Sequence, residues 1–406
     1  MRDRQSMSYK YLYSILLLLC PIILSVNTYE AFQFPKMMFV YIFGFFIITL
    51  FLTHKVNLWE KITLGSRPVA IYLVAFSIST VLSSHIYTSV WGYYSRFVGG
   101  LMSAIVFYGL YIVGINVFNR KRVLGILEVG ALTVLPLSVY GIIQHYGYSY
   151  QRVHSTIGQP NWLAQYIVMV MPVILYSSLV KKSNFWSLVF LLCYACLWFT
   201  YSISGMLGFI VMLAFFLYFL FREKLLNIRI TFLLVCMIAF SLLNPGIFGD
   251  RVKSIFQDMR KITEAAIVVH AQEGQLSDPG VIRLGIWQGT LALAFSSLKN
   301  FIFGTGPETF PYEFQKFRPA GLNFSSEWDF VVNKPHNYYL ELLAEQGVVG
   351  LVFWGAVFVG VFRKVPFYLK AGLAGYLVTN IFGWPTVNTE LLFWMFAAYA
   401  GAKTDE

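Results

Sequence analysis

Long apolar stretches recur along the whole chain, and short polar segments separate them. Each stretch has 16 to 23 residues, close to the ~20 residues that an α-helix needs to cross a bilayer. Twelve stretches can be distinguished, at residues 11–26, 37–53, 68–83, 98–118, 123–143, 163–180, 185–201, 204–221, 228–243, 340–362, 365–382 and 387–402. Because backbone polar groups in lipid must be satisfied internally, we expect an all-α polytopic membrane protein with about twelve transmembrane helices.

The apolar pattern is interrupted once, by a long polar segment in the second half of the chain. We therefore divide the chain into residues 1–243 with nine spans, a loop at 244–336, and residues 337–406 with three spans. Helical spacing of apolar residues predicts an amphipathic helix from Arg251 to His270 and a second helix from Arg283 to Leu298. Loops of this length in compact proteins are usually functional, so a simple linker is disfavoured.

Composition supports a membrane protein. Hydrophobic residues make up 58% of the chain and charged residues only 12%, whereas ordinary globular domains carry roughly 25% charged residues. All four cysteines lie in apolar stretches, including the Cys193–Cys196 pair, which argues for packing and against a disulfide framework or a zinc cluster.

The basic residues alternate between the two sides of the predicted membrane. If the amino terminus is cytoplasmic, inside segments hold 18 of the 30 basic residues and short outside loops hold only Lys36, Arg96 and Arg152. The positive-inside rule then places both termini in the cytoplasm and the 244–336 loop outside. That loop holds nine basic and nine acidic residues, so the net charge of +11 reflects topology and no nucleic-acid partner is expected.

Candidate chemistry is concentrated on the outside. Arg96 lies in WGYYSRFVGG, and Arg283 lies in the long loop. Arg152 begins RVHSTIGQPNW, whose Pro160 and Asn161 are expected to begin the sixth span. His336 begins the tenth span, where Asn337 is suited to cap the helix. Each residue alone is more often structural, but three arginines and an imidazole on one side of the membrane suit a diphosphate and an incoming hydroxyl.

Acidic residues near these positions have weaker claims to a chemical role. Glu341 and Glu345 lie about 140° and 180° around the helix from His336, so we expect them to face the loop or other helices. Glu128 is the clearest charged residue inside a span, and we expect it to reach the surface or pair with the basic residues at 120–122. Proton-coupled carriers generally need more ionisable groups at the membrane centre, which disfavours transport.

Five motifs together resemble the O-antigen ligase and O-antigen polymerase superfamily of bacterial polytopic glycosyltransferases, which includes protein O-oligosaccharyltransferases. They cover roughly residues 90–400, in the order found in the family. The motifs are STIGQPNWLAQY, TYSISGMLGF, RLGIWQGTLAL, FGTGPETF and HNYYLELLAEQGVVGL, at residues 155–166, 200–209, 283–293, 303–310 and 336–351.

The resemblance implies a GT-C-like fold and a reaction on the outer face of the bacterial inner membrane. A glycan would pass from undecaprenyl diphosphate to an acceptor hydroxyl, on the lipid A core for a ligase or on another carrier-linked glycan for a polymerase. His336 resembles the family's proposed base and Arg283 its diphosphate-contacting arginine. No cofactor or metal is expected. The predicted substrate-binding residues are Arg96, Arg152, Gln159, Asn161, Asn337 and Tyr338.

One position departs from the family pattern. Ile203 stands where the family often has an arginine, so Arg96 or Arg152 would have to supply that charge. The predicted reaction is an inverting displacement at the anomeric carbon. The alternatives are a polymerase or protein O-oligosaccharyltransferase of the same superfamily, a flippase or transporter for lipid-linked oligosaccharides, and a non-catalytic assembly partner.

Overall fold

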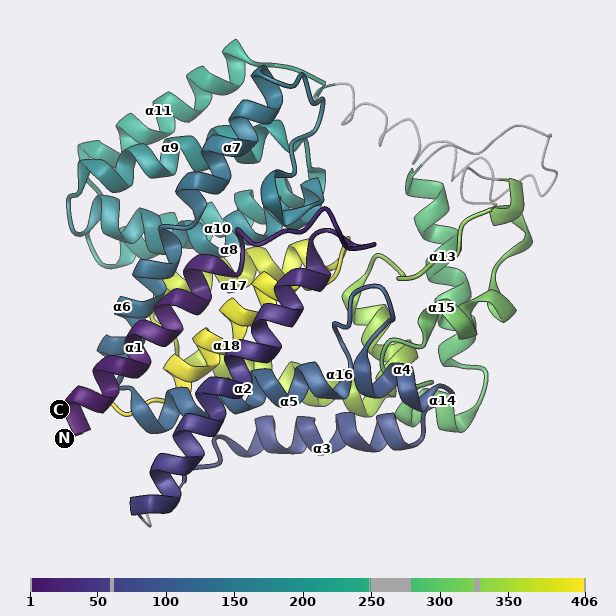
Figure 1. The fold of residues 1–406 in the computed structure, drawn as a ribbon. Coiled ribbons are helices and arrows are strands. Elements are labelled where there is room, and N and C mark those ends of the chain that lie inside the picture. The colour runs from purple at the N-terminus through teal and green to yellow at the C-terminus, as the bar shows by residue number, and fades with distance from the viewer. Residues whose placement is uncertain (1, 59–61, 248, 250–278, 325–328, 405–406) are drawn as a thin grey trace.

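The chain folds into helices joined by short turns and loops (Figure 1). The structure is a computed structural model that describes residues 2–58, 62–247, 249, 279–324 and 329–404. Within those residues there is no β-strand, and the predicted all-helical architecture is confirmed. The helices are α1 (Arg2–Leu19), α2 (Gln33–Leu58), α3 (Arg67–Val81), α4 (Ile86–Trp91), α5 (Leu101–Val117), α6 (Arg120–Ala131), α7 (Val134–Tyr146), α8 (Pro160–Leu179), α9 (Asn184–Phe199), α10 (Ile203–Arg222), α11 (Ile228–Leu243), α13 (Pro279–Ala294), α14 (Leu298–Phe303), α15 (Phe310–Glu313), α16 (Tyr338–Lys364), α17 (Phe367–Asn380) and α18 (Val387–Gly401).

Every predicted apolar stretch overlaps a helix, and the fifth stretch is divided between α6 and α7. Among the described residues, five helical segments are long and apolar enough to cross a membrane. They are Gln33–Lys55, Arg120–Tyr146, Pro160–Leu179, Ile203–Arg222 and Tyr338–Lys364. The helices are thus those of a polytopic membrane protein, while the number twelve and the GT-C-like assignment stay predictions.

Helix α8 lies at the centre of the main bundle. It is buried along nearly its whole length and packs against α9, α10 and α17. Cys193 and Cys196 of α9 are free and buried in this core, as expected for packing residues. Burying a helix on all sides requires an apolar circumference, which the sequence of α8 provides.

Helices α13 to α15 form a smaller unit beside the bundle, on the right in Figure 1. This unit has its own apolar core, which includes Ile286 and Leu293 of α13 together with Phe310 and Phe314. The second predicted loop helix is therefore present, but it begins at Pro279 and ends at Ala294. Ser297 then caps the separate helix α14 by accepting from the Asn300 amide at 3.1 Å. The predicted helix at 251–270 lies outside the described residues.

The two termini lie close together at one end of the molecule (Figure 1). The Arg120 amide donates to the Lys403 carbonyl at 3.2 Å, which ties α6 to the carboxyl terminus. Glu128 pairs with Lys181, and Ser177 donates to it at 3.3 Å. Glu128 therefore faces the end of α8, where its side chain is partly exposed and its ion-pair partner is Lys181.

Candidate functional site

His336 lies directly before α16 in a constrained backbone. Its φ is 55°, a value in the left-handed region that costs a non-glycine residue of order 1–3 kcal/mol. Two contacts hold the segment. The Trp287 indole of α13 donates to the Pro335 carbonyl at 3.0 Å, and the Asn337 side-chain oxygen accepts from the amides of Tyr339 and Leu340 at 3.0 and 3.1 Å. The predicted cap at Asn337 is confirmed.

The surroundings of His336 keep its imidazole neutral. Burial and, to a smaller extent, the positive charges of Arg283 and Arg96 together lower its pKa from 6.5 to about 4. Near pH 7 the ring is therefore uncharged, and one ring nitrogen has a lone pair that can accept a proton. The influence of both arginines means that the structure brings together three of the predicted site residues.

Trp384, which sequence reasoning missed, joins these residues. The His336 ring meets its indole edge-on, with ring centroids 5.0 Å apart. The Arg96 guanidinium carbon lies 5.8 Å from the centroid of the same indole. The only signal in the sequence was the turn-forming Gly383-Trp384-Pro385 between two apolar stretches.

Arg152 and Asn161 form a second polar group beside His336. Arg152 donates to the Asn161 side-chain oxygen at 3.1 Å and to the Thr200 carbonyl at 3.0 Å. Ser202, the cap of α10, donates to the same Asn161 oxygen at 2.8 Å. Asn161, Gln159 and His336 line a small cavity of about 10 Å³ with Trp384. Arg152 therefore lies beside the turn that precedes Ile203.

Gln159 has a structural role as well as its place in that cavity wall. Its side-chain oxygen accepts from the Trp162 amide at 3.0 Å and caps α8. Pro160 occupies the first position of α8, as the sequence predicts.

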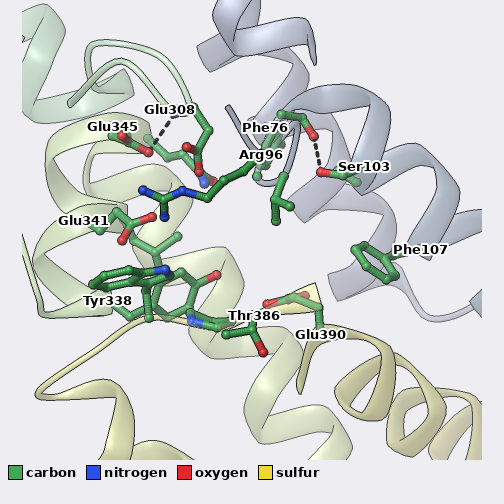
Figure 2. Close-up of a pocket in the computed structure, with 18 of the residues that line it drawn as sticks. Phe76, Arg96, Ser103, Phe107, Glu308, Tyr338, Glu341, Glu345, Thr386 and Glu390 are labelled. Atoms are coloured by element: carbon green, nitrogen blue, oxygen red, sulfur yellow. Dashed lines mark hydrogen bonds between the residues drawn. The ribbon is translucent and has the colours of Figure 1, made fainter. Parts of the chain in front are cut away.

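A larger cavity of about 100 Å³ lies on the Arg96 side of Trp384 (Figure 2). Its walls come from α3, α5, α16, α18 and the loops between them, and Tyr338 lines it from α16. Trp384 lines both cavities, so it stands between the larger one and His336.

A buried ionic cluster lines the same cavity. The Lys334 ammonium contacts the carboxylates of Glu308 and Glu341 at 2.5 and 2.6 Å, and all three side chains are buried. Burial lowers the pKa of Lys334, but the carboxylates of Glu308, Glu341 and Glu345 outweigh it and raise the pKa above its ordinary value. Lys334 is therefore a permanent cation two residues before His336.

Glu345 fixes the backbone that carries Glu308. Its carboxylate accepts from the Glu308 and Phe310 amides at 2.8 and 3.1 Å. As predicted, Glu341 and Glu345 face the loop. Their i, i+4 spacing on an otherwise apolar helix was the signal for this cluster, but its partners were not identifiable from the sequence.

Gly347 makes this docking possible because α16 is kinked there, with φ of 66° and ψ of −175°. The kink leaves two carbonyls of the preceding turn available to the loop. Thr305 donates its amide to the Ala344 carbonyl at 3.0 Å, and Gly306 donates to the Glu345 carbonyl at 2.9 Å. A Cβ on Gly347 would lie 2.2 Å from the Ile302 carbonyl oxygen, so only glycine fits.

The carboxylates of Glu308, Glu341 and Glu345 are close enough together to hold one metal ion. Lys334, however, already contacts two of the three carboxylates. Its ammonium provides the positive charge that this group of acids needs in the present arrangement.

Taken together, the helices and this polar site define a polytopic helical membrane protein with a buried ionic centre at the amino end of α16. Residues 188–355 match a protein-family model described as O-Antigen ligase. The match supports a relation to the O-antigen ligase and polymerase superfamily. This family suggests a membrane glycosyltransferase-type enzyme of lipopolysaccharide biosynthesis. No curated protein matches the chain. The matched region contains Arg283, Lys334 and His336, whereas Arg96, Arg152 and Trp384 lie outside it.

Proposed function

We propose that this protein is an O-antigen ligase-type glycosyltransferase. It moves a glycan from undecaprenyl diphosphate to a hydroxyl of the lipid A core on the outer face of the bacterial inner membrane, with both termini in the cytoplasm. The observation that carries this proposal is the neutral imidazole of His336, whose pKa is lowered by burial and by Arg283 and Arg96. A proton acceptor next to fixed positive charge is what the displacement of a diphosphate needs.

In the proposed step, His336 accepts the proton of the acceptor hydroxyl as the oxygen attacks the anomeric carbon. The bond from that carbon to the diphosphate oxygen breaks, and its electron pair leaves with the diphosphate, so the configuration is inverted. General-base assistance of this kind contributes about 10²–10⁴ in rate. Arg283, Arg96 and Arg152 balance the negative charge that grows on the leaving group, and no metal ion is needed for that purpose.

Arg152 is the better candidate to replace the family arginine at Ile203. It contacts the Thr200 carbonyl and Asn161 directly beside the amino end of α10. Arg96 lies instead over the ring of Trp384, with its guanidinium carbon 5.8 Å from the ring centroid. We therefore assign Arg152, with Gln159 and Asn161 nearby, to the diphosphate.

Replacing His336 tests the mechanism. We expect His336→Ala to reduce glycan transfer by at least a hundredfold in purified protein, with folding intact, because the proton acceptor is lost. His85→Ala is the matched control, since His85 is a partly exposed histidine that contacts Glu313 at 3.3 Å, and it should keep full activity. Equal activity of both variants would contradict the proposed base.

The same assay separates the rival functions. Purified protein that joins donor to acceptor in detergent is an enzyme, whereas a flippase or an assembly partner gives no product. The choice between ligase and polymerase is made with a deletion strain. Free polymer that is made but not attached indicates a ligase, and a single-repeat product indicates a polymerase.

A further inference from the structure

The larger cavity contains a hydrogen-bond acceptor without a donor. Glu341 is 6% exposed, and its Oε1 accepts from Lys334 at 2.6 Å. Its Oε2 is buried and accepts from no described residue. A buried carboxylate oxygen without a partner is costly, so this wall of the cavity calls for a ligand that donates hydrogen bonds.

Acidic side chains outnumber basic ones on the wall of the cavity. Among the described lining residues are the carboxylates of Glu308, Glu341, Glu345 and Glu390, and only two cations, Arg96 and Lys334. Figure 2 shows Glu390 facing the cavity from α18, opposite the group formed by Glu341 and Arg96. Lys334 is already in contact with two of the carboxylates. Carboxyl groups thus outnumber cationic groups around the cavity, which suits a ligand with several hydrogen-bond donors.

Several aromatic side chains also line the cavity. Tyr72 and Phe76 of α3, Phe107 of α5, Tyr338 of α16 and Trp394 of α18 line the cavity. Binding sites of this kind hold the apolar face of a ligand on rings and orient it with a few polar groups. At 10–15 Å³ for each water-sized group, 100 Å³ holds roughly seven to ten such groups. That is enough for the six ring atoms of one sugar and some of its substituents, and the remaining substituents extend out of the cavity.

We propose that this cavity is a subsite for one neutral or amine-bearing sugar ring, whose hydroxyl or amino groups donate to Glu341 Oε2 and Glu390 while its C–H face packs on the aromatic side chains. The inference rests on the proposed function and adds the substrate class of one part of the site. The diphosphate is then bound beside Arg152 and Arg283, next to His336.

The test uses the full chain in lipid nanodiscs and three probes, N-acetylglucosamine, glucosamine and glucose 6-phosphate, in equilibrium binding. We expect saturable binding of the first two and at least tenfold weaker binding of glucose 6-phosphate. Ala104→Leu, which fills the cavity from α5, and Glu341→Gln should each weaken glucosamine binding at least tenfold. Ile105→Phe is the matched control, because this neighbouring side chain is 38% exposed on the outside of the same helix.

Glucose 6-phosphate binding as tightly as glucosamine would overturn the proposal, as would unchanged binding in Ala104→Leu. If no probe binds saturably, water alone satisfies Glu341 and the subsite does not exist. His336→Ala should keep sugar binding. Sugar binding by a wild-type protein that transfers no glycan would refute the proposed function while leaving the subsite intact.

Discussion

At His336 the electrostatics of the site act on a single titratable group. Burial and two guanidinium groups favour the neutral ring, so the pKa of about 4 is lower than that of an ordinary histidine. A base with such a low pKa is weak in the empty protein. A bound diphosphate would offset the charge of Arg283 and Arg96 and make the ring more basic when an acceptor has to be deprotonated.

This coupling predicts two different pH profiles. A lowered pKa means that the free protein keeps its neutral imidazole until the pH falls to about 4, so kcat/KM should fall only near that pH. With donor bound the pKa rises toward 6.5, so kcat should begin to fall at a higher pH. Initial rates between pH 4 and 8 measure the pH dependence of kcat and of kcat/KM. If both quantities fell at the same acidic pH, the coupling would be contradicted. Arg283→Gln removes one positive charge near His336, so kcat/KM of this variant should begin to fall at a higher pH than in the wild type.

At the scale of elements, the site depends on the contact between α16 and the loop at 303–310. The kink at Gly347 turns two carbonyls of α16 toward the loop, and Ser79 of α3 also donates to the Glu345 carbonyl at 2.9 Å. Glu308 comes from this loop and enters the Lys334 cluster. The break in α16 interrupts its own backbone hydrogen bonds, and it positions the residues of the cavity.

Substitutions at two glycines of α16 test this account. Gly347→Ala should destabilise the protein by about 2 kcal/mol or more, because it strains a positive φ and drives a Cβ into the Ile302 carbonyl. Gly355→Ala is the control, since a Cβ there meets nothing within 4 Å and improves helix propensity by up to about 1 kcal/mol. Thermal unfolding followed by tryptophan fluorescence measures both, and equal midpoints would refute the role of the kink.

At the scale of the whole molecule, the charge pattern and the fold agree on one arrangement. The termini lie together in Figure 1, and Arg122 of α6 donates to Ser6 of α1 at 2.8 Å. The basic segments at residues 2–10, 120–122 and 403 thus lie at the same end of the bundle, as the positive-inside rule requires of one membrane face.

Labelling of single cysteines tests this topology. Cys236, which is only half-buried, is first replaced by serine. A cysteine at exposed Gln151 should react with an impermeant thiol reagent added outside the inner membrane, and a cysteine at exposed Lys121 should react only after permeabilisation. The reverse pattern would invert the orientation and place His336 on the wrong side for a lipid-carrier donor.

The sequence by itself determined the helices, the membrane class and the local ends of the helices that carry the site. Hydrophobic period and capping are local properties, so Pro160 and Asn337 could be placed correctly from their neighbours alone. The bonds that build the cavity join distant segments. Ser79 and Glu345 are 266 residues apart, and Trp384 contacts both Arg96 and His336, which come from separate segments of the chain. Only packing decides such partners, because lone charges in a polar loop carry no information about which buried group they will face.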